Sequence, residues 1–180
     1  SLMGFIAWVF WDQELRYSLP TPVPSHFVDV KVGEEVDLKN EFASSRRNFV
    51  LLHFYNPDCP CSRFNIEEFE SLAHQYKGQI DFYAVIQSDE KDAADLFKKK
   101  YDMDVPAILD RDGIISDKCG IYATPQAVLI DKASRIFFKG NYNMARFCTA
   151  KETKFVEIAI NSLLQNKPLP LFIQYTMTEP

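Results

Sequence analysis

Apolar and polar positions along the chain predict a sheet whose strands are separated by helices. Residues 48–55 are nearly continuously apolar, which is typical of a central strand buried on both faces. Residues 63–77 carry apolar side chains at helical spacing and are followed by Gly78, a residue that suits a helix end. Period-two patterns predict further strands at 80–87, 105–109, 126–130 and 135–139, the last two joined as a hairpin.

Further helices are expected between and after these strands. One should begin near Asp89 and run to Tyr101, a short one should cover 114–120, and a last one should cover 151–165. Strand and helix alternate first, and a hairpin followed by a helix closes the chain. This order predicts an α/β fold with a mixed central sheet flanked by helices on both faces.

Proline and apolar runs divide the chain into four parts. Alternating prolines at 19–25 predict an extended linker, because proline excludes helix and stiffens the backbone. The folded domain is expected at 26–167, opening with a short strand at 27–31 and a turn at Gly33. The proline-bearing tail, 168–180, is expected to be irregular.

The N-terminal segment, 1–18, is an apolar helix by its pattern. A helix that spans a membrane needs about 20 apolar residues, and this run is roughly half that length. Trp8 and Trp11 are followed by charged residues, an arrangement typical of the interfacial end of a membrane helix. One interpretation is therefore the end of a membrane anchor. The alternative is a helix that packs on its own domain or on a second copy.

Composition excludes several classes of function. The length of 180 residues suits one domain with extensions, and a core of that size needs no disulfide scaffold. A net charge of −5 without a long basic run gives no basis for binding nucleic acid. The four cysteines are too few for a disulfide framework, so their positions carry the information.

Two of these cysteines, Cys59 and Cys61, stand where the central strand gives way to a helix. Unpaired N–H groups and the helix dipole at such a site favour the thiolate, which is the species that attacks a disulfide. Arg63 can add positive charge or be a solvated surface residue. On a helix, residues two apart point about 200° away from each other, so a Cys59–Cys61 disulfide would need a non-helical loop.

Three segments resemble the thioredoxin superfamily, especially redoxins and membrane-tethered bacterial thioredoxin-like proteins. The first is Phe54-Tyr55 followed by Pro57-Asp58-Cys59-Pro60-Cys61. The second is the run from Cys119 to Pro125 before a strand, and the third is the hairpin ending at Lys139-Gly140. The resemblance covers about two thirds of the chain and implies a thioredoxin-like fold in which Pro125 is cis and faces the cysteines, with Thr124 beside it to contact substrate.

The chain departs from this family at the cysteine pair, because relatives usually separate the two cysteines by two residues. Alignment on Cys59 puts Ser62 at the second position, whereas alignment on Cys61 puts Asp58 at the first. The interpretation preferred here takes Cys59 as the nucleophile. His53, six residues earlier, stands where relatives often carry a buried acid that relays protons. It is a candidate relay or, alternatively, a core histidine with satisfied hydrogen bonds.

Strand directions predict where the other two cysteines lie. Cys119 precedes the strand at 126–130, and Cys148 follows the hairpin, so both are expected near the edge at which the central strand ends. Either one can be a resolving partner for Cys59. The alternatives are a buried small hydrophobe for Cys119 and an unpaired loop or core cysteine for Cys148.

The leading functional hypothesis is a thiol–disulfide oxidoreductase that acts on protein or small-molecule disulfides without a cofactor or metal. A peroxidase is disfavoured, because Asn56 and Leu52 occupy the positions where peroxiredoxins carry threonine or serine and proline. A copper(I)- or zinc-binding module is a second candidate, since thiolates are soft ligands. A non-catalytic binding domain is a third. The expected location is the periplasmic side of a bacterial inner membrane, with pairing of two copies through the apolar N-terminus as a further expectation.

Overall fold

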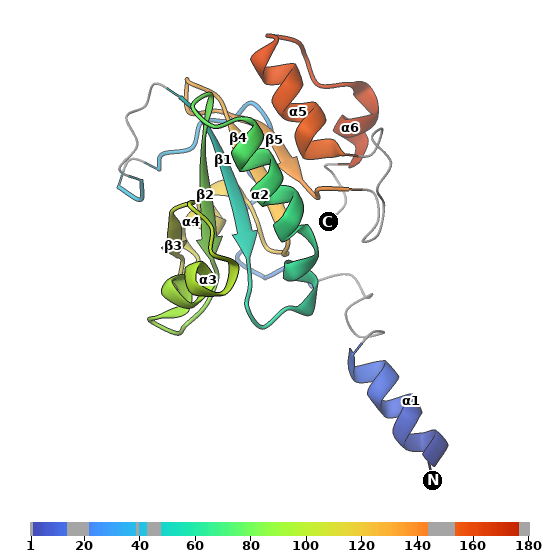
Figure 1. The fold of residues 1–180 in the computed structure, drawn as a ribbon. Helices are drawn as coiled ribbons and strands as arrows, with labels where there is room; N and C mark the ends of the chain where they lie inside the picture. Colours follow the sequence, from blue (N-terminus) through green and yellow to red (C-terminus); the bar gives the residue numbers. More distant parts are fainter. Residues whose placement is uncertain (1, 14–21, 39, 43–47, 144–153, 177–180) are drawn as a thin grey trace.

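A five-stranded mixed sheet forms the centre of the computed structural model, which describes residues 2–13, 22–38, 40–42, 48–143 and 154–176 (Figure 1). The strand order is β3-β2-β1-β4-β5, in which β1 is central. Strand β1 pairs in parallel with β2 and antiparallel with β4, so the predicted mixed sheet is confirmed. The strands are β1 Phe49–Tyr55, β2 Ile80–Ile86, β3 Ala107–Leu109, β4 Gln126–Ile130 and β5 Ile136–Gly140.

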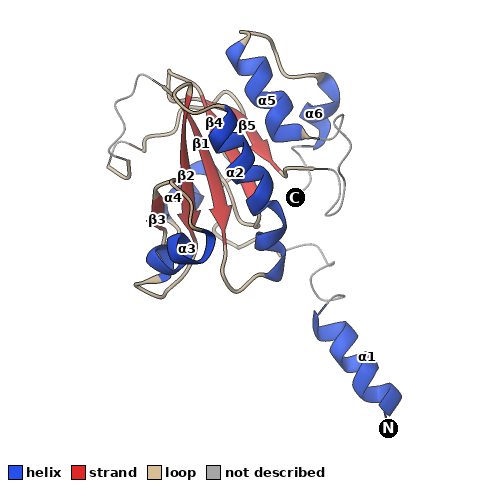
Figure 2. Cartoon of the chain, viewed as in Figure 1, coloured by secondary structure: helices blue, strands red, loops and turns tan. Residues whose placement is uncertain are grey.

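Helices cover both faces of the sheet (Figure 2). The larger core lies on one face and is formed with α2, α3, α5 and α6, whereas the smaller core on the other face is formed with α4 and residues 30–42. These helices are α2 Ile66–Gln75, α3 Ala93–Tyr101, α4 Ile114–Cys119, α5 Phe155–Leu164 and α6 Leu171–Thr176. The helix expected to begin near Asp89 thus begins at Ala93.

Strand β1 separates the two cores, as its apolar sequence predicts. Leu51 and Tyr55 pack into the larger core, and Leu52 and Phe54 pack into the smaller one. Successive side chains of a strand point to opposite faces, so a strand covered on both sides requires apolar residues at every position. The end of β1 is thereby held rigidly, and the cysteine segment follows directly from it.

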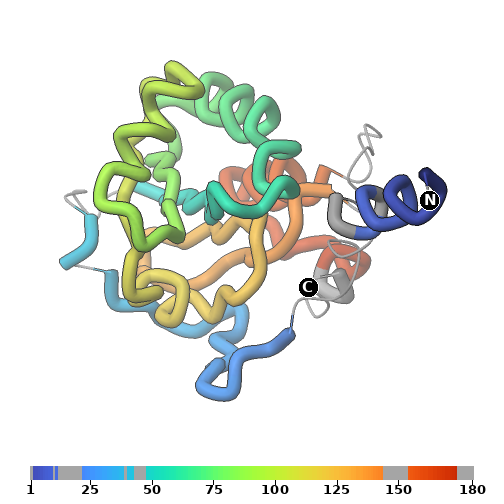
Figure 3. Tube along the Cα trace, turned by 90° about the horizontal axis from the view of Figure 1, so that it is seen from below, coloured from blue at the N-terminus to red at the C-terminus, as the bar shows by residue number. Residues whose placement is uncertain are grey.

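The strand predicted at residues 27–31 is not formed. This segment runs along the outside of β5, on the side of the molecule away from α2, as the view from below shows (Figure 3). Its backbone contacts with the start of β5 come just after it, where Glu35 forms an isolated bridge with Arg135 and Gly33 N–H donates to the Ile136 carbonyl at 2.7 Å; the side chains of Asp29 and Lys139 also form an ion pair. Alternating polarity indicated an extended chain here, and the missing feature is a continuous partner strand.

The C-terminal tail corrects the predicted domain boundary. Residues 168–180 were expected to be irregular, yet α6 lies within them, and Leu169 and Ile173 are buried in the larger core. Pro170 opens the helix, since its carbonyl accepts a hydrogen bond from Ile173 N–H at 3.0 Å. The sequence did not reveal this helix, because Pro168 and Pro170 indicated an irregular tail, although a proline is well tolerated at the start of a helix.

Helix α1, Leu2–Gln13, stands apart from the folded body (Figure 1). Its apolar side chains are more than half exposed at six positions, Leu2, Met3, Phe5, Ile6, Trp8 and Trp11. None of the helices in the described part of the chain combines the length and the apolar character that crossing a membrane requires.

Candidate active site

The segment after β1 is a tight turn built by two polar side chains. Asn56 Oδ1 accepts a hydrogen bond from Asp58 N–H at 2.8 Å, and Ser62 Oγ accepts one from Asn56 N–H at 3.1 Å. The Asn56 carbonyl accepts from Cys59 N–H at 3.2 Å, and the Cys59 carbonyl accepts from Ser62 N–H at 3.1 Å. The backbone is therefore fixed on both sides of Cys59.

Cys59 is the residue at which helical structure begins. It has an extended conformation, with φ −94° and ψ 114°, and it immediately precedes a 3₁₀ helix, η2, Pro60–Asn65, which continues into α2. Pro60 suits the first helical position, because its φ is already helical and it lacks an N–H group there. Cys59 and Cys61 are both half-buried.

The first turn separates the two cysteines and buries the serine. In a 3₁₀ helix side chains three residues apart eclipse one another, so Cys61 does not share a direction with a neighbour two residues away. Ser62, which occupies the family's second cysteine position when Cys59 is the first, is completely buried and holds the turn through Asn56. Its role here is structural.

Tyr55, at the end of β1, lies close to the cysteine turn. The Tyr55 and Tyr101 hydroxyls are 3.1 Å apart. Burial and this hydrogen bond raise the pKa of Tyr55. The Arg63 side chain acts to lower that pKa and the Cys59 side chain acts to raise it, so Arg63 and Cys59 both lie within electrostatic range of the Tyr55 hydroxyl. Arg63 Nε donates to the Pro60 carbonyl at 3.2 Å. The sequence placed Tyr55 only as a strand end, because Tyr101 approaches it from 46 residues away.

Cys119 lies in the smaller core, at the end of α4. Its side chain is completely buried among apolar residues, including Ile115, Ile121 and Ile136. Burial raises the pKa of the Cys119 thiol to about 12, and the negative charge of Asp110 acts in the same direction. Cys119 therefore has the surroundings of a small core hydrophobe. Cys148, the other predicted partner, lies outside the described residues.

His53 is buried between β1 and α2. Its Nδ1 atom is 2.7 Å from the Tyr142 hydroxyl, and its ring stacks on Phe69 with the centroids 4.6 Å apart. Desolvation lowers the pKa of His53 to about 3, so the ring is neutral at physiological pH. The other ring nitrogen has no hydrogen-bond partner among the described residues.

The loop before β4 contains the predicted substrate-contacting residues. The Thr124–Pro125 peptide bond is cis, and both residues are half-buried. The loop follows α4, whose last residue is Cys119, and Gly120 ends that helix with a positive φ of 62°. The position of α4 thus determines where Thr124 and Pro125 lie.

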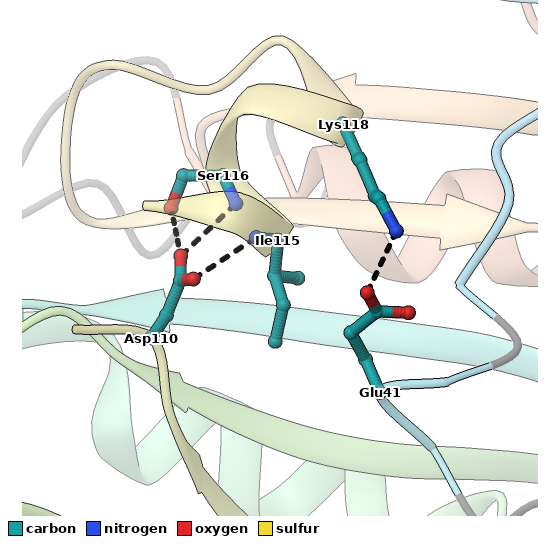
Figure 4. Close-up of polar contacts among 5 residues, drawn as sticks. All are labelled: Glu41, Asp110, Ile115, Ser116 and Lys118. Atoms are coloured by element: carbon teal, nitrogen blue, oxygen red, sulfur yellow. Dashed lines mark hydrogen bonds and ion pairs between the residues drawn. The ribbon is translucent and has the colours of Figure 1, made fainter. Parts of the chain in front are cut away.

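A buried carboxylate that the sequence did not single out holds α4 (Figure 4). Asp110 accepts hydrogen bonds from Ile115 N–H at 2.9 Å, from Ser116 N–H at 3.0 Å and from the Ser116 hydroxyl at 2.5 Å. Gln87, directly after β2, donates to the same hydroxyl at 2.5 Å. In the sequence Asp110 is one acidic residue of a turn, and only the packing of α4 against β3 distinguishes it from its exposed neighbour Asp112.

An ion pair attaches the N-terminal segment to the same helix. Lys118 Nζ lies 2.6 Å from Glu41 Oε1 (Figure 4).

Among the described residues there is no group of three or more His, Cys, Asp or Glu side chains arranged to hold a metal ion. A metal site at the turn after β1 would have Cys59 and Cys61 as its ligands within the described chain.

Two curated proteins and several solved structures are similar to this chain. The thiol-disulfide oxidoreductase ResA of Bacillus cereus (strain ATCC 10987 / NRS 248) is 26% identical over 129 residues, which are 71% of this chain and 72% of that protein. ResA of Bacillus thuringiensis subsp. konkukian (strain 97-27) is also 26% identical over the same shares.

The structural neighbours support the fold. A hypothetical protein from Sinorhizobium meliloti 1021 has a TM-score of 0.61 and 20% identity, over 70% of this chain and 74% of that chain. A putative thioredoxin from Neisseria meningitidis has a TM-score of 0.54 and 20% identity, over 67% and 77% respectively. The predicted thioredoxin-like architecture is thus confirmed.

One family model matches nearly all of the folded part. It is described as a domain of unknown function, DUF6436, and it matches residues 29–178, which include the cysteine turn, the Pro125 loop and α6. Because this match spans most of the chain, the protein belongs to the DUF6436 family, and its sheet order and structural neighbours give it a thioredoxin-like fold.

Proposed function

We propose that the protein is a thiol–disulfide oxidoreductase in which Cys59 is the attacking residue. The observation that carries this proposal is the position of Cys59, half-buried at the start of the helical turn that follows the central strand. The backbone N–H groups of a first helical turn stabilise negative charge on such a sulfur. The similarity to proteins named ResA supports the same activity.

The reaction that follows from this geometry is a two-step exchange. The Cys59 thiolate attacks one sulfur of a substrate disulfide, a mixed disulfide forms, and the other substrate sulfur leaves as a thiolate. A second thiolate of the protein then attacks Cys59 and releases the reduced substrate. The substrate gains two electrons, and two protein thiols become one disulfide, which an external dithiol must reduce for another cycle.

Cys61 and Cys148 are the candidates for the second thiol. Cys119 is the weakest candidate, because its sulfur is fully buried and the pKa of its thiol is raised to about 12. A bond between Cys59 and Cys61 requires the first turn to open, since Ser62 N–H is bonded to the Cys59 carbonyl. In this proposal His53, which is neutral and hydrogen-bonded to Tyr142, is a structural residue and not a proton relay.

The apolar helix α1 supports attachment of the domain to a membrane surface. Its exposed side chains lie on all sides of the helix, which is unlike the single apolar stripe of a helix that packs on a protein. Two tryptophans at its end suit the interface between lipid and water. In this proposal the domain works outside the inner membrane on disulfides of proteins or small thiols.

Disulfide mapping and an activity assay test the redox function together. The protein is oxidised mildly, alkylated and analysed without reduction by mass spectrometry, and insulin reduction by dithiothreitol is followed in parallel. We expect a disulfide that contains Cys59, loss of activity in Cys59→Ser and unchanged activity in Cys119→Ser. Four free thiols after oxidation together with no catalysis of insulin reduction would exclude the proposal.

A trapping experiment then identifies the second thiol. In Cys61→Ser, a mixed disulfide between Cys59 and a substrate peptide accumulates if Cys61 normally resolves it. If the same complex accumulates only in Cys148→Ser, the resolving residue is Cys148. Copper(I) titration of the reduced protein is the control for the metal-binding alternative.

A further inference from the structure

Strand β5 is the outer strand of the sheet beside the Pro125 loop. Among the described residues its outer side is bridged only at its start, by Glu35 opposite Arg135 and by two hydrogen bonds to Ile136. From Phe137 to Gly140 its ladder partners in the described chain are all on β4. Unpaired N–H and C=O groups on an edge strand are a template for another strand.

A groove of about 840 Å³ lies along this open part of the edge. One wall is β5, including Phe137, Lys139 and Gly140, and the other is the segment that contains Phe27, Lys31 and Val32. One ion pair joins the two walls, because Lys139 Nζ is 2.8 Å from Asp29 Oδ1; the same Nζ donates to the carbonyl of Gly120, at the end of α4, at 3.2 Å. The volume falls within the range of about 300–1,000 Å³ that is usual for ligand sites.

The groove extends to the start of β4, where Gln126 pairs with Phe54 near the end of β1. Gln126, the first residue of β4, lines it directly after Pro125, and Tyr122 of the same loop lines it as well. The rings of Tyr122 and Phe27 meet edge to face with their centroids 4.7 Å apart, so an aromatic surface closes this end. A chain lying in the groove therefore reaches the loop that contains the predicted substrate-contacting residues, Thr124 and Pro125.

We propose that this groove binds an extended peptide segment of the substrate protein, which adds a strand to the open half of β5. The proposal rests on the thiol–disulfide function proposed above and identifies its substrate as a protein chain in extended form. Main-chain hydrogen bonds to β5 supply affinity, and apolar side chains of the peptide pack on Phe27, Val32 and Tyr122. The side chain of Val32, which is 41% exposed in the structure, becomes buried in the complex.

The charges along the groove favour an acidic residue in the peptide. Its lining holds three cations, Lys31, Arg135 and Lys139, and two anions, Asp29 and Asp131. Arg135 pairs with Asp131, and Asp29 pairs with Lys139 and also lies within electrostatic range of Lys31, so the three cations exceed the two anions by one charge. The whole protein carries a net charge of −5, so this local excess of positive charge is a distinct feature of the groove.

Nuclear magnetic resonance with defined peptides tests the proposal on the complete chain. The probe is a capped hexapeptide of sequence Glu-Val-Thr-Val-Tyr-Val, and its controls are the same peptide with Lys in place of Glu and two versions with alternate backbone amides N-methylated. We expect amide shifts along Phe137 to Gly140 and slowed hydrogen exchange at alternate amides of this stretch with the acidic probe, and loss of binding for one of the two N-methylated versions.

Matched variants separate the groove from general electrostatics. Lys31→Glu should weaken binding about two- to fivefold, the effect of one exposed ion pair. Lys99→Glu, an equal charge change on α3 away from the groove, should not. Phe27→Ser should weaken binding while leaving the overall amide spectrum folded. Absence of shifts at β5, equal binding of both N-methylated peptides, or self-association of the protein through this edge would each overturn the proposal.

Reduction of a small disulfide separates this proposal from the redox function. Dithiobis(nitrobenzoate) has no peptide chain, and its reduction reports on the cysteines alone. If it is reduced while no peptide occupies β5, the groove proposal fails and the oxidoreductase stands. If the peptide binds β5 but no disulfide is reduced, the redox function fails and the groove remains a peptide-binding site.

Discussion

The buried side chain of His53 makes the free energy of unfolding depend on pH. The imidazole stacks on Phe69 and pairs with the Tyr142 hydroxyl, and no charged partner in the described chain compensates for its desolvation. Burial lowers the pKa of His53 from 6.5 to about 3. Between these two values the unfolded chain binds a proton that the folded protein does not, so the free energy of unfolding falls as the pH decreases below 6.5.

We predict that His53→Gln reduces this pH dependence. The wild type should lose about 2 kcal/mol of stability between pH 6.5 and pH 5. In this range the unfolded chain binds one more proton than the folded protein, and this difference lowers the free energy of unfolding by up to about 1.4 kcal/mol per pH unit. Glutamine offers Tyr142 a hydrogen-bond partner but does not titrate. Urea unfolding at several pH values measures the difference between the two slopes.

His26→Gln is the matched control, since His26 is exposed. It should keep the slope of the wild type. If His53→Gln and the wild type lose stability in parallel between pH 6.5 and pH 5, the histidine is protonated in the folded state and the proposed structural role is wrong.

At the scale of elements, α4 is attached through one carboxylate. Asp110 satisfies two N–H groups of the first turn of α4 and the Ser116 hydroxyl, and it is buried. We predict that Asp110→Ala destabilises the protein by about 2–4 kcal/mol, because it leaves buried donors unsatisfied. Chemical unfolding measures this loss, and Asp112→Ala, at an exposed position in the same turn, should change stability by less than about 0.5 kcal/mol.

Gly120 offers a second test of an element contact. A Cβ atom there would lie 2.6 Å from Val30 N, and the residue has a φ of 62°. Gly120→Ala should therefore both strain the backbone and push residues 29–31 away from α4. We expect a loss of about 3 kcal/mol or more in the free energy of unfolding and faster proteolysis within residues 22–33.

Gly113→Ala separates the two effects. Gly113 has a similar φ of 69°, but a Cβ atom added there would have no atom of the described chain within 4 Å beyond its immediate neighbours. This variant should show only the backbone cost, about 1–2 kcal/mol, and normal proteolysis of residues 22–33. Equal effects of the two substitutions would show that contact with Val30 does not hold the N-terminal segment.

At the scale of the whole molecule, helix α1 contributes no side chain to either of the two cores described. Its apolar side chains are exposed, and the buried residues of both cores come from other segments of the described chain. We predict that the protein binds neutral phosphatidylcholine vesicles and that Phe5→Glu with Trp8→Glu weakens this binding by about 2 kcal/mol or more, through loss of apolar burial. Vesicle sedimentation measures binding, with Val28→Glu, at an exposed apolar residue outside α1, as the control.

Periodic apolar patterns predicted most of the fold. All five strands and helices α2 to α5 were expected close to where they lie, since each one buries an apolar face that leaves a regular trace in the sequence. Residues 27–31 have the alternating pattern of a strand but no continuous partner strand in the structure, and α6 was missed because the prolines before it indicated an irregular tail. The same limit applies to Asp110, whose burial depends on a helix from elsewhere in the chain.

The cysteine site divides in the same way. The amino-acid sequence by itself determined that Cys59 lies between a buried strand and a helical turn, because strand and helix formation are local and the proline at position 60 favours a helix start there. Only the tertiary structure decided that Ser62 closes the turn, that Cys119 is enclosed in the smaller core and that, among the described residues, β5 has its ladder partners from Phe137 to Gly140 on β4 alone. These features depend on contacts between segments far apart in the chain, and hydrogen bonding and desolvation at such contacts cannot be read from a local pattern.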